Sequence, residues 1–140
     1  MRLAARHQAF ADLHQSGCFV IPNPWDIGSA RMMAALGAKA LATSSAGYAF
    51  TLGRPDMGRV TRDEMLAHAQ DMVAATDLPV SGDFENGFGD DPDTVAETVR
   101  LAGEVGLSAG SCRGGWVGRV ARAPSSPSMP GICMSSKATR

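Results

Sequence analysis

The apolar and polar positions of the chain alternate between short β-like runs and longer stretches with helical spacing. Small and apolar residues in segment 3–13 predict an N-terminal helix, and residues 18–21 predict a short strand. Asp26 can cap the next helix, whose apolar positions follow helical spacing, and Gly37 can end it. The first part of the chain is therefore predicted to run helix, strand, helix.

The clearest helical pattern lies in the middle of the chain. Residues 39–44 predict a second strand, and residues 45–56 predict a loop. Thr61 and Glu64 then have the spacing of a capping box, in which each side chain binds the other residue's backbone N–H. The apolar residues that follow recur on one helical face: Met65, Leu66, Ala69, Met72 and Val73.

A third strand and a further helix complete the regular pattern. The strand is predicted over residues 78–84, and Asp91-Pro92 opens the helix, with proline at a suitable first position. Alternating strands and helices with short connections predict parallel strands and right-handed crossovers. Both a TIM-type (β/α)₈ barrel and a doubly wound, flavodoxin-like sheet fit this order. Residues 22–25 (Pro-Asn-Pro-Trp) make a poor phosphate-binding loop, which counts against the second.

The polar segments of the chain all follow predicted strands. They are residues 23–26, 44–47 and 83–89, whereas the turns after the helices are short and chemically plain. In both architectures the chemistry occurs beyond the carboxyl ends of the strands. We therefore expect these three segments to gather at one rim.

Asp83 and Glu85 are the most informative pair of residues on that rim. If the strand continues through them, alternation points both carboxylates to the same side. Two such carboxylates suit a Mg²⁺ ion, which takes one or two of them together with waters and substrate oxygens. The alternative is a solvated turn with acidic residues at its edge.

Composition sets the class of protein. The 140 residues have the usual size of one domain, and 44% are hydrophobic and 19% charged. The sequence has no apolar run near the roughly 18 residues that a membrane span needs, and its start lacks the apolar centre of a secretory signal. We expect a cytoplasmic protein with no membrane partner. Three widely spaced cysteines predict neither a disulfide framework nor a zinc cluster.

The chain changes character near Gly106. Residues 1–105 carry all 14 acidic and 8 of the 13 basic residues, whereas residues 106–140 carry 5 basic and no acidic residues. Periodicity also ends there, and Ser, Gly and Pro accumulate, a composition that stays disordered. We therefore expect a partial barrel over residues 1–106 and an irregular, disordered tail over residues 107–140. A basic arm for nucleic acid is the alternative, but Trp116 is its one aromatic residue, and we expect no nucleic-acid partner.

Three segments, residues 19–31, 42–56 and 82–89, resemble the isocitrate lyase and phosphoenolpyruvate mutase superfamily. The resemblance covers about residues 10–106, in order and with family-like spacing. It implies a TIM-type barrel, of which this chain has the N-terminal half, and a Mg²⁺ cofactor. It also implies making or breaking a C–C or P–C bond next to a 2-oxo acid, through an enolate-like intermediate. Members of the family are usually homo-oligomers.

The resemblance also implies roles for individual residues. Asp83 and Glu85 match the acidic metal motif, which commonly reads Asp-x-Asp, and Asp56 matches a catalytic acid in a mobile active-site loop. One further segment matches the family's site for the substrate carboxylate, formed by backbone amides and a serine hydroxyl: Ser44, Ser45, Ala46 and Gly47. Trp25 and Asp26 either line the pocket or serve packing and capping. His68 is expected at the surface or the edge of the core.

The family pattern stops where the composition changes. The family continues with a strand that ends in an acidic motif such as Ile-Glu-Asp, whereas residues 106–116 contain no acid. The lysine-and-cysteine motif of the lyase branches and the other strands of a barrel, which needs roughly 250 residues, are also missing. The function expected is a Mg²⁺-dependent lyase or phosphonomutase-like enzyme for a small 2-oxo acid, impaired by truncation. The alternative is an inactive fragment that self-associates or binds metal weakly.

A shifted reading frame would explain this sudden change. Some codon choices for residues 111–115 (Ser-Cys-Arg-Gly-Gly) read Val-Glu-Glu one base later, close to the missing acidic motif. We expect the nucleotide sequence beyond the codon for Gly106 to encode a barrel-like continuation in a shifted frame. Sequencing the gene through these codons tests this, and the hypothesis fails if neither shifted frame gives such a continuation.

Overall fold

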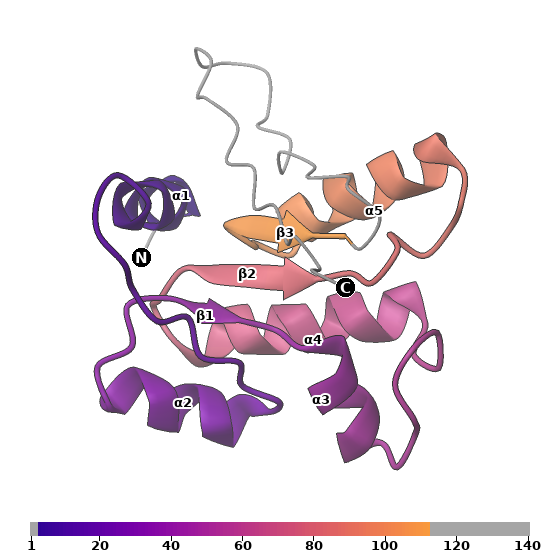
Figure 1. The fold of residues 1–140 in the computed structure, drawn as a ribbon, viewed down its shortest axis with the longest axis horizontal. Coiled ribbons are helices and arrows are strands. Elements are labelled where there is room, and N and C mark those ends of the chain that lie inside the picture. Colours follow the sequence, from indigo (N-terminus) through magenta and orange to yellow (C-terminus); the bar gives the residue numbers. More distant parts are fainter. Residues whose placement is uncertain (1–2, 113–140) are drawn as a thin grey trace, which may run out of the picture.

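The computed structural model describes residues 3–112, which form a three-stranded parallel sheet and five helices (Figure 1). The strands alternate with helices along the chain, so the fold is mixed α/β, as predicted. The elements in chain order are α1 (Leu3–Leu13), α2 (Ile27–Ala35), β1 (Leu41–Ala42), α3 (Ser45–Thr51), α4 (Arg62–Ala75), β2 (Val80–Asp83), α5 (Pro92–Glu104) and β3 (Ala109–Ser111).

The strands pair in chain order, β1-β2-β3, and every pair is parallel. In the register of the sheet, Leu41 lies opposite Val80, and Asp83 lies opposite Ser111. Helices α3 and α4 connect the first two strands, and α5 connects the second to the third. The carboxyl ends of the strands therefore lie together, on the right in Figure 1.

Helices α2, α4 and α5 begin at the capping residues that the sequence predicts. Asp26 accepts a hydrogen bond from Ser29 N at 2.6 Å at the start of α2. Thr61 and Glu64 form the expected capping box of α4, and Asp91 caps α5 with proline in its first turn. These bonds satisfy backbone N–H groups that have no partner inside the helix.

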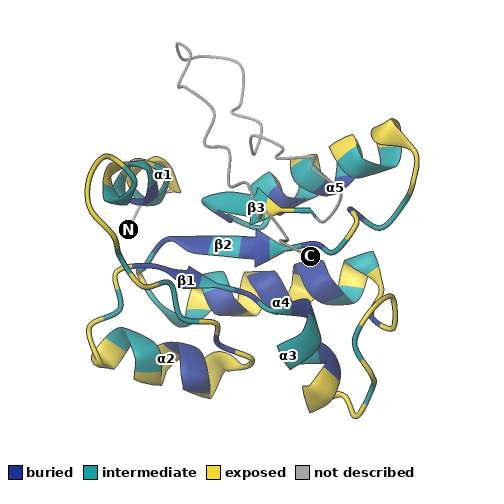
Figure 2. Cartoon of the chain, viewed as in Figure 1, coloured by how far each residue is buried: buried dark blue, intermediate teal, exposed yellow. Residues whose placement is uncertain are grey.

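The core lies between the sheet and α4. Leu41, Val80 and Phe84 are almost fully buried and belong to one apolar cluster with Met65 and Met72 of α4. Burial alternates along β2, so Val80 and Gly82 are buried while Ser81 and Asp83 are only partly covered. Figure 2 shows buried positions on β1 and β2 and at intervals along α4. The helix face of the sheet thus supplies the packing, and the opposite face carries Asp83.

Helix α1 is joined to the amino-terminal side of the sheet by long-range hydrogen bonds. Arg6 donates to the carbonyl oxygens of Val73 at 2.9 Å and Thr76 at 2.7 Å, near the end of α4. His7 Nε2 donates to the carbonyl oxygen of Leu107 at 3.0 Å. In this way the first helix is tied to the end of α4 and to the segment between α5 and β3.

The strand predicted over residues 18–21 is not regular. This segment has no regular secondary structure, and a hydrogen bond to the sheet follows directly after it, from Ala42 N to Pro22 O at 3.1 Å. Pro22 and Pro24 have no N–H, so they cannot continue a ladder beside β1. Proline thus limits a predicted strand to a single backbone contact.

Two further segments differ from the prediction. Residues 45–51 form α3 instead of a loop, because Ser44 caps them by accepting a hydrogen bond from Gly47 N. Strand β3 lies beyond the predicted boundary at residue 106, since backbone pairing with β2 does not require an apolar pattern. The predicted disordered tail otherwise lies outside the described residues. Within residues 3–112, no helix is both long enough and apolar enough to cross a membrane.

Gly82 is required by close packing on the helix face of the sheet. A Cβ at this position would lie 2.5 Å from Phe84 Cε2 and 2.7 Å from Leu107 Cδ1. We expect Gly82→Ala to lower the free energy of unfolding by about 1–3 kcal/mol, the usual cost of overpacking a core. Urea denaturation followed by circular dichroism measures this.

Gly28→Ala is the matched control for that experiment. A Cβ at Gly28 would meet only Asp26 Oδ1, at 3.5 Å, and alanine favours a helix. Its stability should equal or exceed that of the unchanged chain. Equal stability of Gly82→Ala and Gly28→Ala would contradict the packing described here.

Candidate active site

Asp83 is held at the carboxyl end of β2 by the segment that follows β1. Its Oδ2 accepts hydrogen bonds from Ser45 N at 3.1 Å and from Ser45 Oγ at 2.8 Å. Its own backbone N–H donates to Thr43 Oγ1 at 2.9 Å. Ser45 and Thr43 are both buried, so these bonds fix the carboxylate in one orientation.

The segment 44–47 forms the first turn of α3. Ser44 accepts a hydrogen bond from Gly47 N at 3.1 Å, and Ser45 directs both of its donors at Asp83. The N–H of Ala46 is a first-turn amide, which has no acceptor inside the helix. Ala46 and the Ser44 hydroxyl are therefore the groups of this segment that a bound carboxylate can still use.

The segment that contains Trp25 lies beside this turn. Asn23 donates its side-chain N–H to Ala42 O at 3.2 Å, and a Cβ at Gly47 would lie 3.4 Å from Trp25 Cβ. Trp25 is exposed, and Asp26 serves as the cap of α2. The segments after the first predicted strand and after β1 are thus brought together, as expected.

Glu85 contacts a different part of the rim. Strand β2 ends at Asp83, and Glu85 has a left-handed φ of 49°, so the strand alternation does not extend to it. Glu85 N donates to Asp83 Oδ1 at 3.3 Å, while Glu85 Oε2 accepts from Gly58 N at 2.9 Å. The Asp83 carboxylate therefore contacts the backbone of Glu85 and not its carboxylate. The Glu85 side chain instead binds the loop between α3 and α4.

Asp56 lies on that loop, two residues before Gly58. Its Oδ1 accepts a hydrogen bond from Met57 N at 2.7 Å, at a bend of the chain. The base of the loop is held by Arg54, which donates to both carboxylate oxygens of Glu64 at 2.9 and 3.0 Å. Asp56 is thus brought to the rim through the loop, without a direct bond to Asp83 among the described contacts.

The chemistry of the oxygen donors fits a hard cation. Three hydrogen bonds occupy the Asp83 carboxylate, which has about four acceptor positions, so one remains for a ligand. No group of three or more His, Cys, Asp or Glu side chains in the described part of the chain could enclose a metal ion. Mg²⁺ does not need such a group, because it usually keeps several waters and binds one or two carboxylates.

His68 is buried, contrary to the expectation that it lies at the surface or at the edge of the core. Its side chain on α4 is 4% exposed, and its ring stacks on Tyr48 of α3 with 4.1 Å between centroids. This contact could not be predicted from the sequence, because the partner helix α3 was predicted as a loop. Burial lowers the pKa of His68, and the charges of Asp71 and Asp26 oppose this shift.

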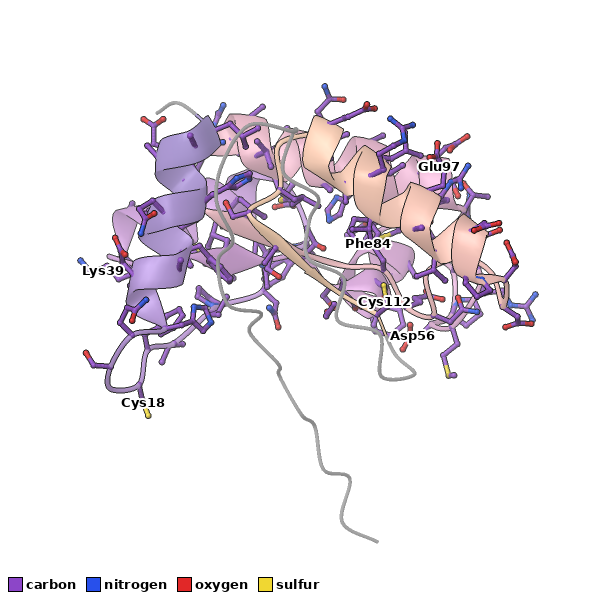
Figure 3. All side chains as sticks on the ribbon, turned by 90° about the horizontal axis from the view of Figure 1, so that it is seen from above. Cys18, Lys39, Asp56, Phe84, Glu97 and Cys112 are labelled. Carbon is purple, nitrogen blue, oxygen red and sulfur yellow. The ribbon has the colours of Figure 1, made fainter. Side chains whose placement is uncertain are left out.

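Cys112 lies directly after β3 and packs against the apolar cluster. Burial raises the pKa of its thiol, and the charge of Asp83 adds to the effect, so the thiol stays protonated. Figure 3 shows Cys112 and Asp56 toward one end of the molecule, with Cys18 and Lys39 toward the other. Cys133 lies outside the described residues.

The model of the phosphoenolpyruvate phosphomutase family matches residues 10–112. The chain therefore belongs to this family. A 2-methylisocitrate lyase from Halalkalibacterium halodurans is 41% identical over 85 residues, which are 61% of this chain and 27% of that enzyme. An uncharacterized protein of Mycobacterium tuberculosis is 39% identical over 101 residues, 71% of this chain and 39% of that protein.

A solved structure shares the fold as well as the sequence. A Burkholderia cenocepacia protein described as a lyase or mutase matches with a TM-score of 0.77 and 58% identity. The match covers 79% of this chain and 40% of that protein. The chain thus spans well under half the length of these proteins.

The buried His68 predicts how stability depends on pH. Its pKa is lower in the folded than in the unfolded chain, so the unfolded state binds more protons as the pH falls below about 6.5. We expect the free energy of unfolding to fall from pH 7 toward pH 5, by at most about 1.4 kcal/mol per pH unit for this one group. Urea denaturation at a series of pH values measures this.

His68→Phe is the control, because phenylalanine keeps an aromatic ring against Tyr48 without a titrating group. The other histidines are the same in both chains, so the difference between the two pH profiles isolates His68. Parallel profiles between pH 7 and pH 5 would show that His68 is not buried as a neutral ring.

Proposed function

We propose that this chain forms the metal- and carboxylate-binding part of a Mg²⁺-dependent lyase or phosphonomutase-like enzyme. Its substrate would be a small 2-oxo carboxylic acid or a precursor of one, and the bond broken or formed would be C–C or P–C. Family membership supports the general class of lyase and mutase, and the Halalkalibacterium relative is a 2-methylisocitrate lyase. A cytoplasmic location remains a prediction.

The observation that carries the proposal is the hydrogen-bonded pair of Asp83 and Ser45. A carboxylate with two donors from one buried serine is fixed before any ligand arrives. A fixed negative charge at the carboxyl end of a parallel sheet is what a cation site requires, because little reorganisation is needed on binding. Ser45 in this proposal orients Asp83, in place of the direct substrate-binding role that the resemblance implies, because both of its donors are directed at Asp83.

The remaining residues have separate roles. Asp83 and Glu85 would hold Mg²⁺, which supplies a Lewis acid for the negative charge that develops on the substrate. The Ser44 hydroxyl and the backbone N–H group of Ala46 would bind the substrate carboxylate, and the small residues Ala46 and Gly47 would allow its close approach. Asp56 would act from the loop, close to the metal and the substrate.

The sheet fits the first part of a TIM-type barrel. Its strands are parallel and in chain order, helix α4 packs against it, and its less buried face carries Asp83. In such a barrel that face would be the interior, and the loops after the strands would form the active site. The share of the relatives' length that the chain covers is consistent with this proposal.

Calorimetric titration with Mg²⁺ and oxalate tests the proposed site. Oxalate is a planar dicarboxylate that mimics an enolate of a 2-oxo acid. We expect heat on adding oxalate in the presence of Mg²⁺, and at least a tenfold loss of affinity in Asp83→Asn, which removes the charge but keeps the size of the side chain.

Asp90→Asn is the matched control, because Asp90 lies in the same loop region and is exposed. Its affinity should equal that of the unchanged chain. Absence of heat with the unchanged chain would favour the alternative, a non-catalytic fragment. Equal losses in Asp83→Asn and Asp90→Asn would mean that the ions bind through general charge and not at Asp83.

A further inference from the structure

We propose that Glu85 is a positioning residue that holds the loop carrying Asp56 against the rim of the sheet. The contact that does this is the hydrogen bond from Gly58 N to Glu85 Oε2, 2.9 Å long. It joins residues that are 27 positions apart in the chain. The inference rests on the proposed function, since Asp56 needs a defined position only if substrate binds at this rim.

The rest of the loop is held at its base. Arg54 binds the Glu64 carboxylate and donates to Arg59 O at 3.2 Å, so both ends of the loop are tied to the start of α4. Residues 56–58 lie beyond these contacts. Among the hydrogen bonds of the described residues, only the bond from Gly58 N to Glu85 links residues 56–58 to another part of the fold. The position of Asp56 therefore depends on Glu85.

Both partners of this bond lie in left-handed backbone. Met57 and Gly58 each have a φ of 69°, and Glu85 has a φ of 49°. Non-glycine residues adopt this conformation only where the surrounding contacts hold it. Asp56 accepts the hydrogen bond of the Met57 N–H, while the N–H of Gly58 donates to Glu85. The local conformations on both sides thus favour the contact.

The length of the Glu85 side chain distinguishes this role from metal binding. Aspartate in its place would end about 1.5 Å short, the length of one C–C bond, and the contact with Gly58 would exceed hydrogen-bond range. Glutamine has the same length and still offers an oxygen acceptor, but it has no charge for a cation. Holding the loop therefore requires length, whereas holding Mg²⁺ requires charge.

Amide hydrogen exchange at Gly58, measured by NMR on the full chain, tests the inference. Glu85→Asp should raise the exchange rate of the Gly58 amide about tenfold, because a hydrogen bond to a charged acceptor is lost. Glu85→Gln should raise it less, about threefold, because a neutral acceptor remains. Asp90→Asn, which removes another acid of the same loop region, should leave the rate unchanged.

An unchanged exchange rate of the Gly58 amide in both Glu85 variants would overturn the inference. If Glu85→Asp does not fold, an unchanged rate in Glu85→Gln alone would overturn it. A larger effect of glutamine than of aspartate would also overturn it, because charge would then matter more than length. Adding Mg²⁺ to the same samples tests the proposed function separately. If Mg²⁺ moves no resonance of Asp83, the metal site is disproved while the Gly58 result still stands.

Discussion

The architecture of this chain depends on the hydrogen bonds between Ser45 and Asp83. They connect the end of one strand to the beginning of the helix that follows its neighbour, across 38 positions of sequence. Because the partners are fixed from both sides, the carboxylate cannot turn away into solvent. The buried hydroxyl of Thr43 holds the backbone of Asp83 from the same neighbouring strand. This polar contact between adjacent strand ends thus holds the segment after β1 and the segment after β2 in one arrangement.

Helix α4 connects this polar rim to the apolar interior. It packs against α2, α5 and β2, and it contributes His68 to the stack with Tyr48. Since Tyr48 lies on the same short helix as Ser45, a disturbance of the stack reaches the rim through a rigid element of seven residues. Apolar packing and polar geometry are therefore coupled through α3.

Much of the fold could be predicted from the sequence, because caps and apolar spacing are local signals. Asp26, the pair of Thr61 and Glu64, and Asp91 all mark the starts of helices correctly. The misses have two causes: α3 has seven residues, too few to show a clear helical spacing, and β3 depends on non-local pairing with β2. For the site, sequence placed the acids at one rim, but the bond between Glu85 and Gly58 depends on backbone turns that no local pattern specifies.

The attachment of α1 has a consequence for how the chain is made. Its hydrogen bond to Leu107 joins residues 100 positions apart, and the bonds of Arg6 span 67 and 70 positions. During synthesis the first helix must therefore wait without its final partners until nearly all of the sheet has left the ribosome. Contacts of this separation slow folding, because the long intervening chain must be ordered before they form. The N-terminal helix, although made first, can be among the last elements to reach its final position.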